Sequence, residues 1–121
     1  MKANELRLGN WIEYKKGHQG TVSAIDDQGY VEVNNSYLKD GVFELSQFQP
    51  IPLTEDWLLK FGFKKIGNCF HKIGFGFYAQ KIKDSIGFHI KRSEISIEIE
   101  HVQQLQNLYF ALTGEELKIE E

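Results

Sequence analysis

The chain has 121 residues, of which 41% are hydrophobic, 26% charged and 13% aromatic, and its formal net charge is −3. These fractions are close to globular averages and exclude intrinsic disorder, collagen-like repeats and long coiled coils. The single cysteine, Cys69, excludes a disulfide-stapled scaffold, and since no apolar run reaches the ~18 residues of a membrane span, we expect a cytoplasmic protein without a membrane segment or signal peptide.

The first part of the chain predicts short β-strands. Four apolar or alternating runs, separated by turns that mostly contain glycine, lie at residues 11–15, 21–25, 30–33 and 42–45. Several short strands at close spacing are typical of a small, strongly bent β-sheet or an SH3-like barrel. We assign this lobe to residues 1–49, as the first half of an α+β fold.

The second part, residues 50–121, predicts a helix, an antiparallel β-meander and a C-terminal helix. Pro50 and Pro52 interrupt the strand pattern, Thr54 has the position of a helix N-cap, and Gly62 is suited to end that helix. The expected helices span 55–61 and 101–112, and the expected strands span 63–66, 69–73, 75–82, 87–91 and 94–99. We expect the two lobes to form one compact unit.

Charge is strongly segregated along the chain. Residues 1–59 carry five basic and nine acidic groups, residues 60–92 carry eight basic groups against Asp84 alone, and residues 93–121 carry one basic group against seven glutamates. The three formal charges are therefore −4, +7 and −6. Because clustered charges within a Debye length of ~8 Å set the local field, the middle segment can attract a phosphate-bearing partner despite the negative net charge. The alternative is that the segments neutralise each other across the fold.

The middle segment also interleaves rings and glycines with its cations. The run Gly74-Phe75-Gly76-Phe77 partly matches the strand with which RNA-recognition domains stack bases. The alternative is a core strand in which glycine relieves crowding. As a binding site, the rings would stack on a base and the cations would attract phosphate. The expected ligand-binding residues are Lys72, Phe75, Phe77, Tyr78, Lys81, Lys83, His89, Lys91 and Arg92.

No pattern indicates catalysis, a metal or a cofactor. Cys69 and His71 lie on one strand face, but structural zinc needs about four ligands and no others have a suitable spacing. A nucleophilic Cys–His pair needs contact and a third orienting group, which positions i and i+2 of a strand do not provide. Phosphate-binding loops, dinucleotide fingerprints and hydrolase motifs are not found. We therefore expect a non-enzymatic protein that binds a nucleotide signal or nucleic acid.

The competing hypothesis is a protein–protein adaptor or inhibitor. It would use the acidic tail after Gly114 or the uncharged polar side of the last helix, Gln103, Gln104, Gln106 and Asn107. Rings of the first lobe are a further candidate surface for a peptide, namely Trp11, Tyr14, Tyr30 and Tyr37. The uncharged side of the last helix is also compatible with a homo-oligomer.

The sequence resembles a family of small, uncharacterised proteins encoded by bacterial phages and prophages. The resemblance rests on MKANELRLGNW at 1–11, IPLTEDWLLKFGF at 51–63 and HVQQLQNLYFALTGEEL at 101–117. It implies no catalytic residues. Because some small phage proteins sequester nucleotide signals of host defence, the resemblance implies such a role as an expectation by analogy.

Overall fold

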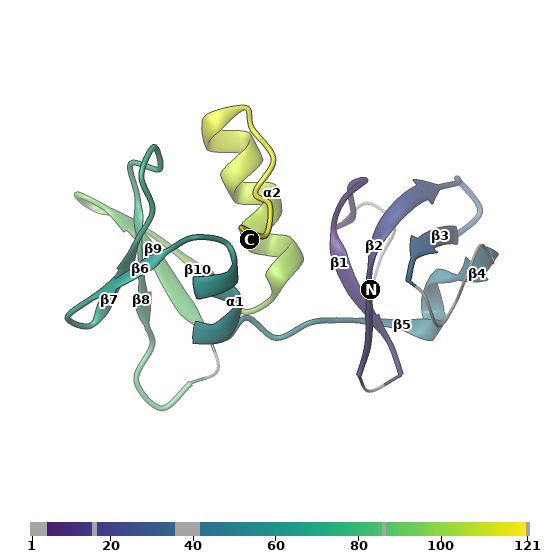
Figure 1. Cartoon of the computed structure of the whole chain (residues 1–121), viewed down its shortest axis with the longest axis horizontal. Helices are drawn as coiled ribbons and strands as arrows, with labels where there is room; N and C mark the ends of the chain where they lie inside the picture. Colours follow the sequence, from purple (N-terminus) through teal and green to yellow (C-terminus); the bar gives the residue numbers. More distant parts are fainter. Residues whose placement is uncertain (1–4, 16, 36–41, 86, 121) are drawn as a thin grey trace. The chain divides into compact units, whose positions relative to one another are not determined.

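The computed structural model describes residues 5–15, 17–35, 42–85 and 87–120. Within these residues the fold is α+β, as the sequence predicts, with two five-stranded antiparallel sheets and two α-helices (Figure 1). The chain divides into two compact units, Met1–Ile51 and Pro52–Glu121, whereas the sequence places this boundary between residues 49 and 50. Each unit is described by itself.

The first unit is an antiparallel sheet of order β4-β3-β2-β1-β5, which agrees with the predicted small β-sheet lobe. Its elements are β1 (Trp11–Tyr14), β2 (His18–Ile25), β3 (Tyr30–Asn34), β4 (Val42–Glu44), the 3₁₀ helix η2 (Leu45–Gln47) and β5 (Phe48–Pro50). The sequence predicts neither η2 nor β5. Pro50 ends β5 opposite Ile12, and β5 is an edge strand, where a residue without an N–H is tolerated.

Alternating side chains of these strands form the core of the first unit. Buried members of this core include Leu6, Ile12, Val22, Val31, Val33, Leu45 and Phe48. Tyr14 packs against Phe43 and Phe48, with ring centroids 5.7 and 5.5 Å apart. Tyr14 is therefore half-buried against the core, with both rings packed on it belonging to the first unit, while Tyr37 lies outside the described residues.

The helices of the second unit begin and end within one residue of the predicted positions. α1 (Glu55–Lys60) is capped by Thr54, whose Oγ1 accepts a hydrogen bond from the Trp57 N–H at 3.3 Å. Gly62 follows with a φ of +89°, and Gly114 ends α2 (Val102–Thr113) with a φ of +77°. Both glycines take the left-handed conformation that side chains disfavour, which explains why each helix stops there.

The second sheet is the predicted meander, in the order β10-β9-β8-β7-β6. Its strands are β6 (Lys64–Ile66), β7 (Cys69–His71), β8 (Tyr78–Lys81), β9 (Phe88–Arg92) and β10 (Ile95–Ile99). The expected strand 75–82 begins three residues before β8, which starts at Tyr78. A turn precedes it, in which the Phe75 N–H bonds to the Lys72 carbonyl at 3.1 Å and Gly74 has a φ of +86°.

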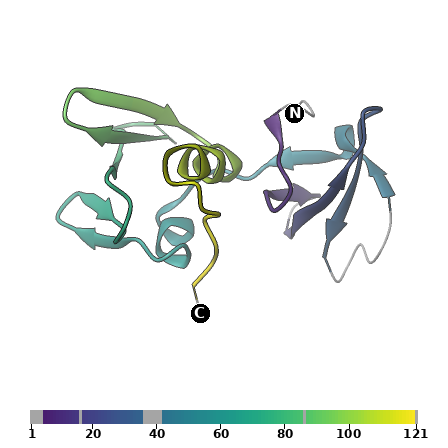
Figure 2. The ribbon, with the colours of Figure 1, turned by 90° about the horizontal axis from the view of Figure 1, so that it is seen from above.

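One face of this sheet is the core face. Phe70, Ala79 and Ile90 lie side by side on it and are buried. Both helices lie on the same side of the sheet (Figures 1 and 2), and buried residues of this unit include Leu58, Phe61, Phe63, Leu105 and Tyr109. The isoleucines of β10 are only partly buried, because Ile95 is 52% and Ile97 36% exposed, whereas Ile99 is buried.

The exposure of α2 also differs in part from the prediction. Leu112 is 43% exposed. Gln103 and Gln106, placed on its exposed polar side, are each only 2% exposed. The polar side of α2 is therefore not the continuous exposed surface that the adaptor hypothesis needs.

Candidate functional site

The face of the second sheet opposite the core face carries a row of polar side chains. Residues directly opposite each other in an antiparallel sheet share a face. The register pairs Lys64 with His71, His71 with Tyr78, Tyr78 with Lys91, and Lys91 with Ser96. One residue from each strand thus forms a line across the sheet, which we call the cationic row: Lys64, His71, Tyr78, Lys91 and Ser96. With strands about 4.8 Å apart, the row is about 19 Å long.

The cationic row is accessible. Lys64, His71 and Ser96 are exposed, and Tyr78 and Lys91 are half-buried. Neither lysine forms an ion pair with a carboxylate of the described residues. The rings of His71 and Tyr78 are stacked, with centroids 5.5 Å apart and an interplanar angle of 28°. Two cations therefore flank a stacked pair of rings, and each ring has one face that the other does not cover.

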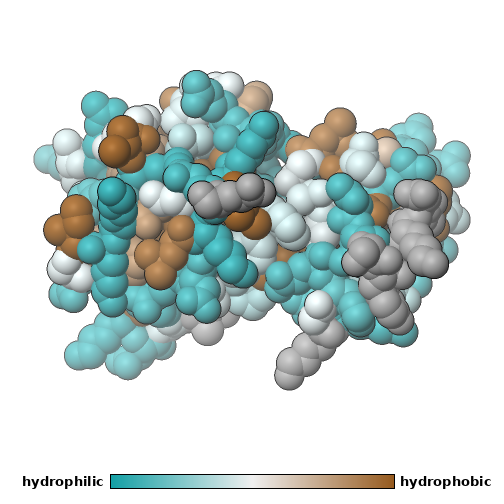
Figure 3. Space-filling model, in the orientation of Figure 1, coloured by the Kyte–Doolittle hydropathy of each residue, from teal (hydrophilic) through white to brown (hydrophobic). Residues whose placement is uncertain are grey.

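A second row on the same face is mostly uncharged. Its residues, again in register, are Ile66, Cys69, Gln80, His89 and Glu98. Glu98 is the only carboxylate in the two rows, so the face has a net positive charge with the histidines neutral. On the side of the molecule seen in Figure 3, apolar residues over the second unit lie in separate patches among hydrophilic ones, which does not indicate a continuous apolar contact surface there.

The two phenylalanines expected to stack on a base are core residues. Phe75 and Phe77 are 6% and 8% exposed and stack on each other with centroids 5.6 Å apart. Phe75 also packs on Tyr109 at 5.1 Å, and the Arg92 guanidinium lies over Phe77 at 5.7 Å. The prediction that these rings contact a ligand is therefore wrong for this structure, and Arg92 covers the core beside them.

Three other predicted cations are not members of the cationic row. Lys81 covers the Phe88 ring at 5.3 Å and donates to the carbonyls of Ser85 and Gly87. Lys83 is exposed in the turn that follows β8. Lys72 donates to the Phe61 carbonyl at 2.8 Å and pairs with Glu120 at 2.5 Å. The cations of the basic segment therefore have different local partners and do not form one cluster.

Of the nine predicted site residues, the open face brings together Tyr78, Lys91 and His89. Lys64, His71 and Gln80 join them and were missed. The signal for His71 is its strand alternation with Cys69, which we weigh for metal binding and for a nucleophilic pair but not for ligand binding. Lys64 reaches the row through the pairing of β6 with β7, and nothing local in the sequence indicates that register.

Among the described residues, no three of His, Cys, Asp and Glu gather closely enough to hold a metal ion. No helix in this part of the chain has both the length and the apolar character needed to cross a membrane. Comparison of the chain with family models, curated proteins and solved structures gives no match. The resemblance to phage proteins therefore stays a prediction, and the site is argued from its own residues.

Proposed function

We propose that this chain is a non-enzymatic protein that binds single-stranded nucleic acid on the open face of its second sheet. The observation that carries the proposal is the cationic row, in which Lys64 and Lys91 flank the stacked rings of His71 and Tyr78. Proteins that bind single strands combine cations along the backbone with rings on which bases stack.

The length and openness of the row favour a strand over a small nucleotide. A row of about 19 Å spans several nucleotides of an extended strand. A lone nucleotide is usually held in a concave site that covers most of its surface, whereas the row runs across a sheet face. Of the two ligands that the sequence suggests, nucleic acid is therefore the one we propose.

The number of cations in the row determines how strongly the binding affinity should depend on salt concentration. Two lysines contacting phosphates give a slope of log affinity against log salt of about −1.4 for a single strand. Stacking of a base on an accessible ring adds about 1–3 kcal/mol. We therefore expect binding that is measurable at low salt and weakens steadily as salt is added.

The test is fluorescence anisotropy of a labelled oligothymidylate titrated with the protein at several salt concentrations. Binding with the salt slope given above, reduced in the variant Lys64→Ala/Lys91→Ala, supports the proposal. The matched control is Lys15→Ala, which removes a cation that belongs to the first unit and lies over the Tyr14 ring. No binding at low salt, or equal losses in the control, would contradict the proposal.

The adaptor hypothesis, the homo-oligomer and a role against host defence stay predictions. Gln103 and Gln106 of the proposed adaptor surface are buried, and Leu117 of the acidic tail is buried as well. These observations favour the sheet face over the helix and tail as the binding surface.

A further inference from the structure

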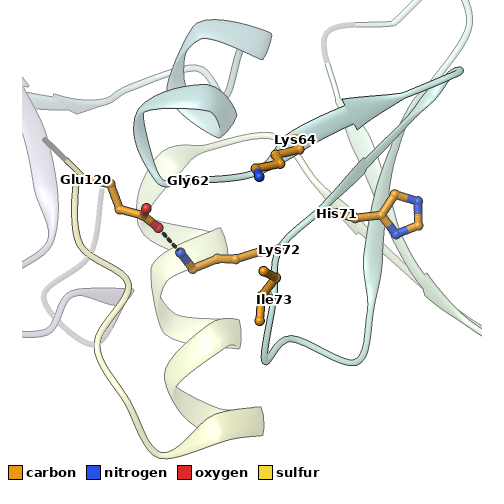
Figure 4. A pocket seen from close by; sticks show the side chains of 6 residues that line it. All are labelled: Gly62, Lys64, His71, Lys72, Ile73 and Glu120. Atoms are coloured by element: carbon orange, nitrogen blue, oxygen red, sulfur yellow. Dashed lines mark hydrogen bonds and ion pairs between the residues drawn. The ribbon is translucent and has the colours of Figure 1, made fainter.

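A small hollow lies at the β6–β7 edge of the cationic row. Its volume is about 220 Å³, and its lining residues are Gly62, Lys64, His71, Lys72, Ile73 and Glu120 (Figure 4). Lys64 and His71 belong to the row. Figure 4 shows Lys72, the residue after β7, directed toward Glu120, and His71 directed away from it. The hollow therefore continues the proposed binding face around the edge of the sheet.

Lys72 makes this hollow an anion site. Its side chain is 14% exposed, and its ammonium donates to the Phe61 carbonyl at 2.8 Å and to Glu120 Oε2 at 2.5 Å. An ammonium has three donors, so one of them has no acceptor among the described residues. A charge that is largely withdrawn from water attracts an anion more strongly than an exposed one, because solvent and salt screen it less.

In this structure the carboxylate of Glu120 lies in the hollow beside Lys72. Leu117, which is 2% exposed, anchors the segment after α2, and the Glu120 N–H bonds to the Lys60 carbonyl at 2.7 Å. The Glu120 carboxylate lies against Gly62, where a Cβ would overlap it. Yet the side chain of Glu120 is 59% exposed, so it can leave the hollow without unfolding the segment behind it.

We infer that the hollow is a subsite for a terminal phosphate of the bound strand, and that Glu120 competes for it. The inference rests on the proposed function. A terminal phosphate carries about −1.5 to −2 charges and three acceptor oxygens, against one charge on a carboxylate. It can use the third donor of Lys72 together with Lys64, and its charge is incompatible with Glu120 at the same ammonium.

The experiment compares three oligothymidylates of equal length, one phosphorylated at the 5′ end, one at the 3′ end and one at neither. Glu120→Gln removes the competing charge and keeps the shape of the side chain. We expect this variant to bind one phosphorylated strand about two- to fivefold more tightly than the natural chain does, the range of an exposed ion pair. Its affinity for the unphosphorylated strand should change no more than that of the matched control Glu115→Gln, which removes an exposed charge from the same segment.

A second measurement separates this inference from the proposed function. Inorganic phosphate is titrated into ¹⁵N-labelled protein, and the expected result is a larger shift of the Gly62 and Lys72 amides in Glu120→Gln than in the natural chain. Strand binding without a gain from any terminal phosphate overturns the subsite and leaves the cationic row in place. Phosphate shifts at Gly62 and Lys72 without strand binding keep the subsite as a phosphate site and overturn the row. Equal gains in both glutamine variants overturn the subsite.

Discussion

The two faces of the second sheet carry different cations of residues 60–92, and the surroundings of these cations differ. On the core face, Lys65 lies over Phe70 at 5.8 Å, Lys81 over Phe88 at 5.3 Å and Arg92 over Phe77 at 5.7 Å. On the open face, Lys64 and Lys91 are unpaired among the described residues and flank two accessible rings.

The comparison shows that two cations adjacent in the sequence can lie on opposite faces of the sheet and contact different groups. Lys64 and Lys65 are adjacent, yet alternation along β6 sends one to each face. The charged groups of the three core-face cations lie over aromatic rings, which attract them. Local charge density in the sequence therefore overstates the number of cations available to a ligand.

The largest expected contrast between the faces is in stability. Phe70 is buried on the core face and packs edge-on against Phe88 at 6.1 Å. Phe70→Ala should lower the free energy of unfolding by about 3–5 kcal/mol, because it leaves a cavity. Tyr78→Ala on the open face should cost about 1 kcal/mol or less. Urea denaturation followed by circular dichroism measures the free energy of unfolding of both variants. Similar losses of free energy would contradict the assignment of a buried core face and an exposed open face.

The next contrast is in binding and uses two matched double variants. Lys64→Ala/Lys91→Ala removes two cations from the open face, and Lys65→Ala/Lys81→Ala removes two from the core-face side. At low salt, we expect about a tenfold loss of oligothymidylate affinity in the first and less than about twofold in the second. Anisotropy titrations compare them directly, and equal losses would mean that only total charge matters.

A smaller effect tests the rings. Tyr78→Ala should lower affinity for a single strand by about fivefold, near the lower limit of base stacking on a ring. Tyr78→Phe keeps the ring and should retain most of the affinity, which makes it the matched control. If the phenylalanine variant loses as much as the alanine variant, the hydroxyl group and not stacking is responsible.

The smallest effect concerns the limit of the core face. Ile97 lies opposite Ile90 in the register, but it is 36% exposed whereas Ile90 is buried. Ile97→Thr should therefore cost less than about 1 kcal/mol of unfolding free energy, and Ile90→Thr several times more. Chemical denaturation of both variants checks this. A large loss for Ile97→Thr would extend the buried part of the core face along β10 from Ile99 to Ile97.

The sequence predicted the local features well because their causes are local. Thr54 caps α1, and the glycines at 62 and 114 end the helices, since each of these roles depends on one residue and its immediate neighbours. Strand positions followed from apolar runs, although the start of β8 did not, because the turn at Gly74 interrupts the alternation that seemed to begin at Phe75.

The site was harder to predict because it depends on pairing across the sheet. The sequence identified Tyr78, His89 and Lys91, but Lys64 and His71 join them only through the register of five strands. Lys72 forms an ion pair with Glu120, 48 positions along the chain. No local sequence pattern predicts such a contact. Phe75 likewise packs on Tyr109, far away in the sequence, and Phe77 stacks on Phe75.

The most direct test of the cationic row is an NMR titration of the ¹⁵N-labelled chain with oligothymidylate. The account predicts that the largest amide and side-chain shifts fall on the open face, at Lys64, His71, Tyr78, Lys91 and Ser96, while residues of the core face and of the first unit change little. Shifts concentrated on α2 or on the sheet of the first unit would contradict it.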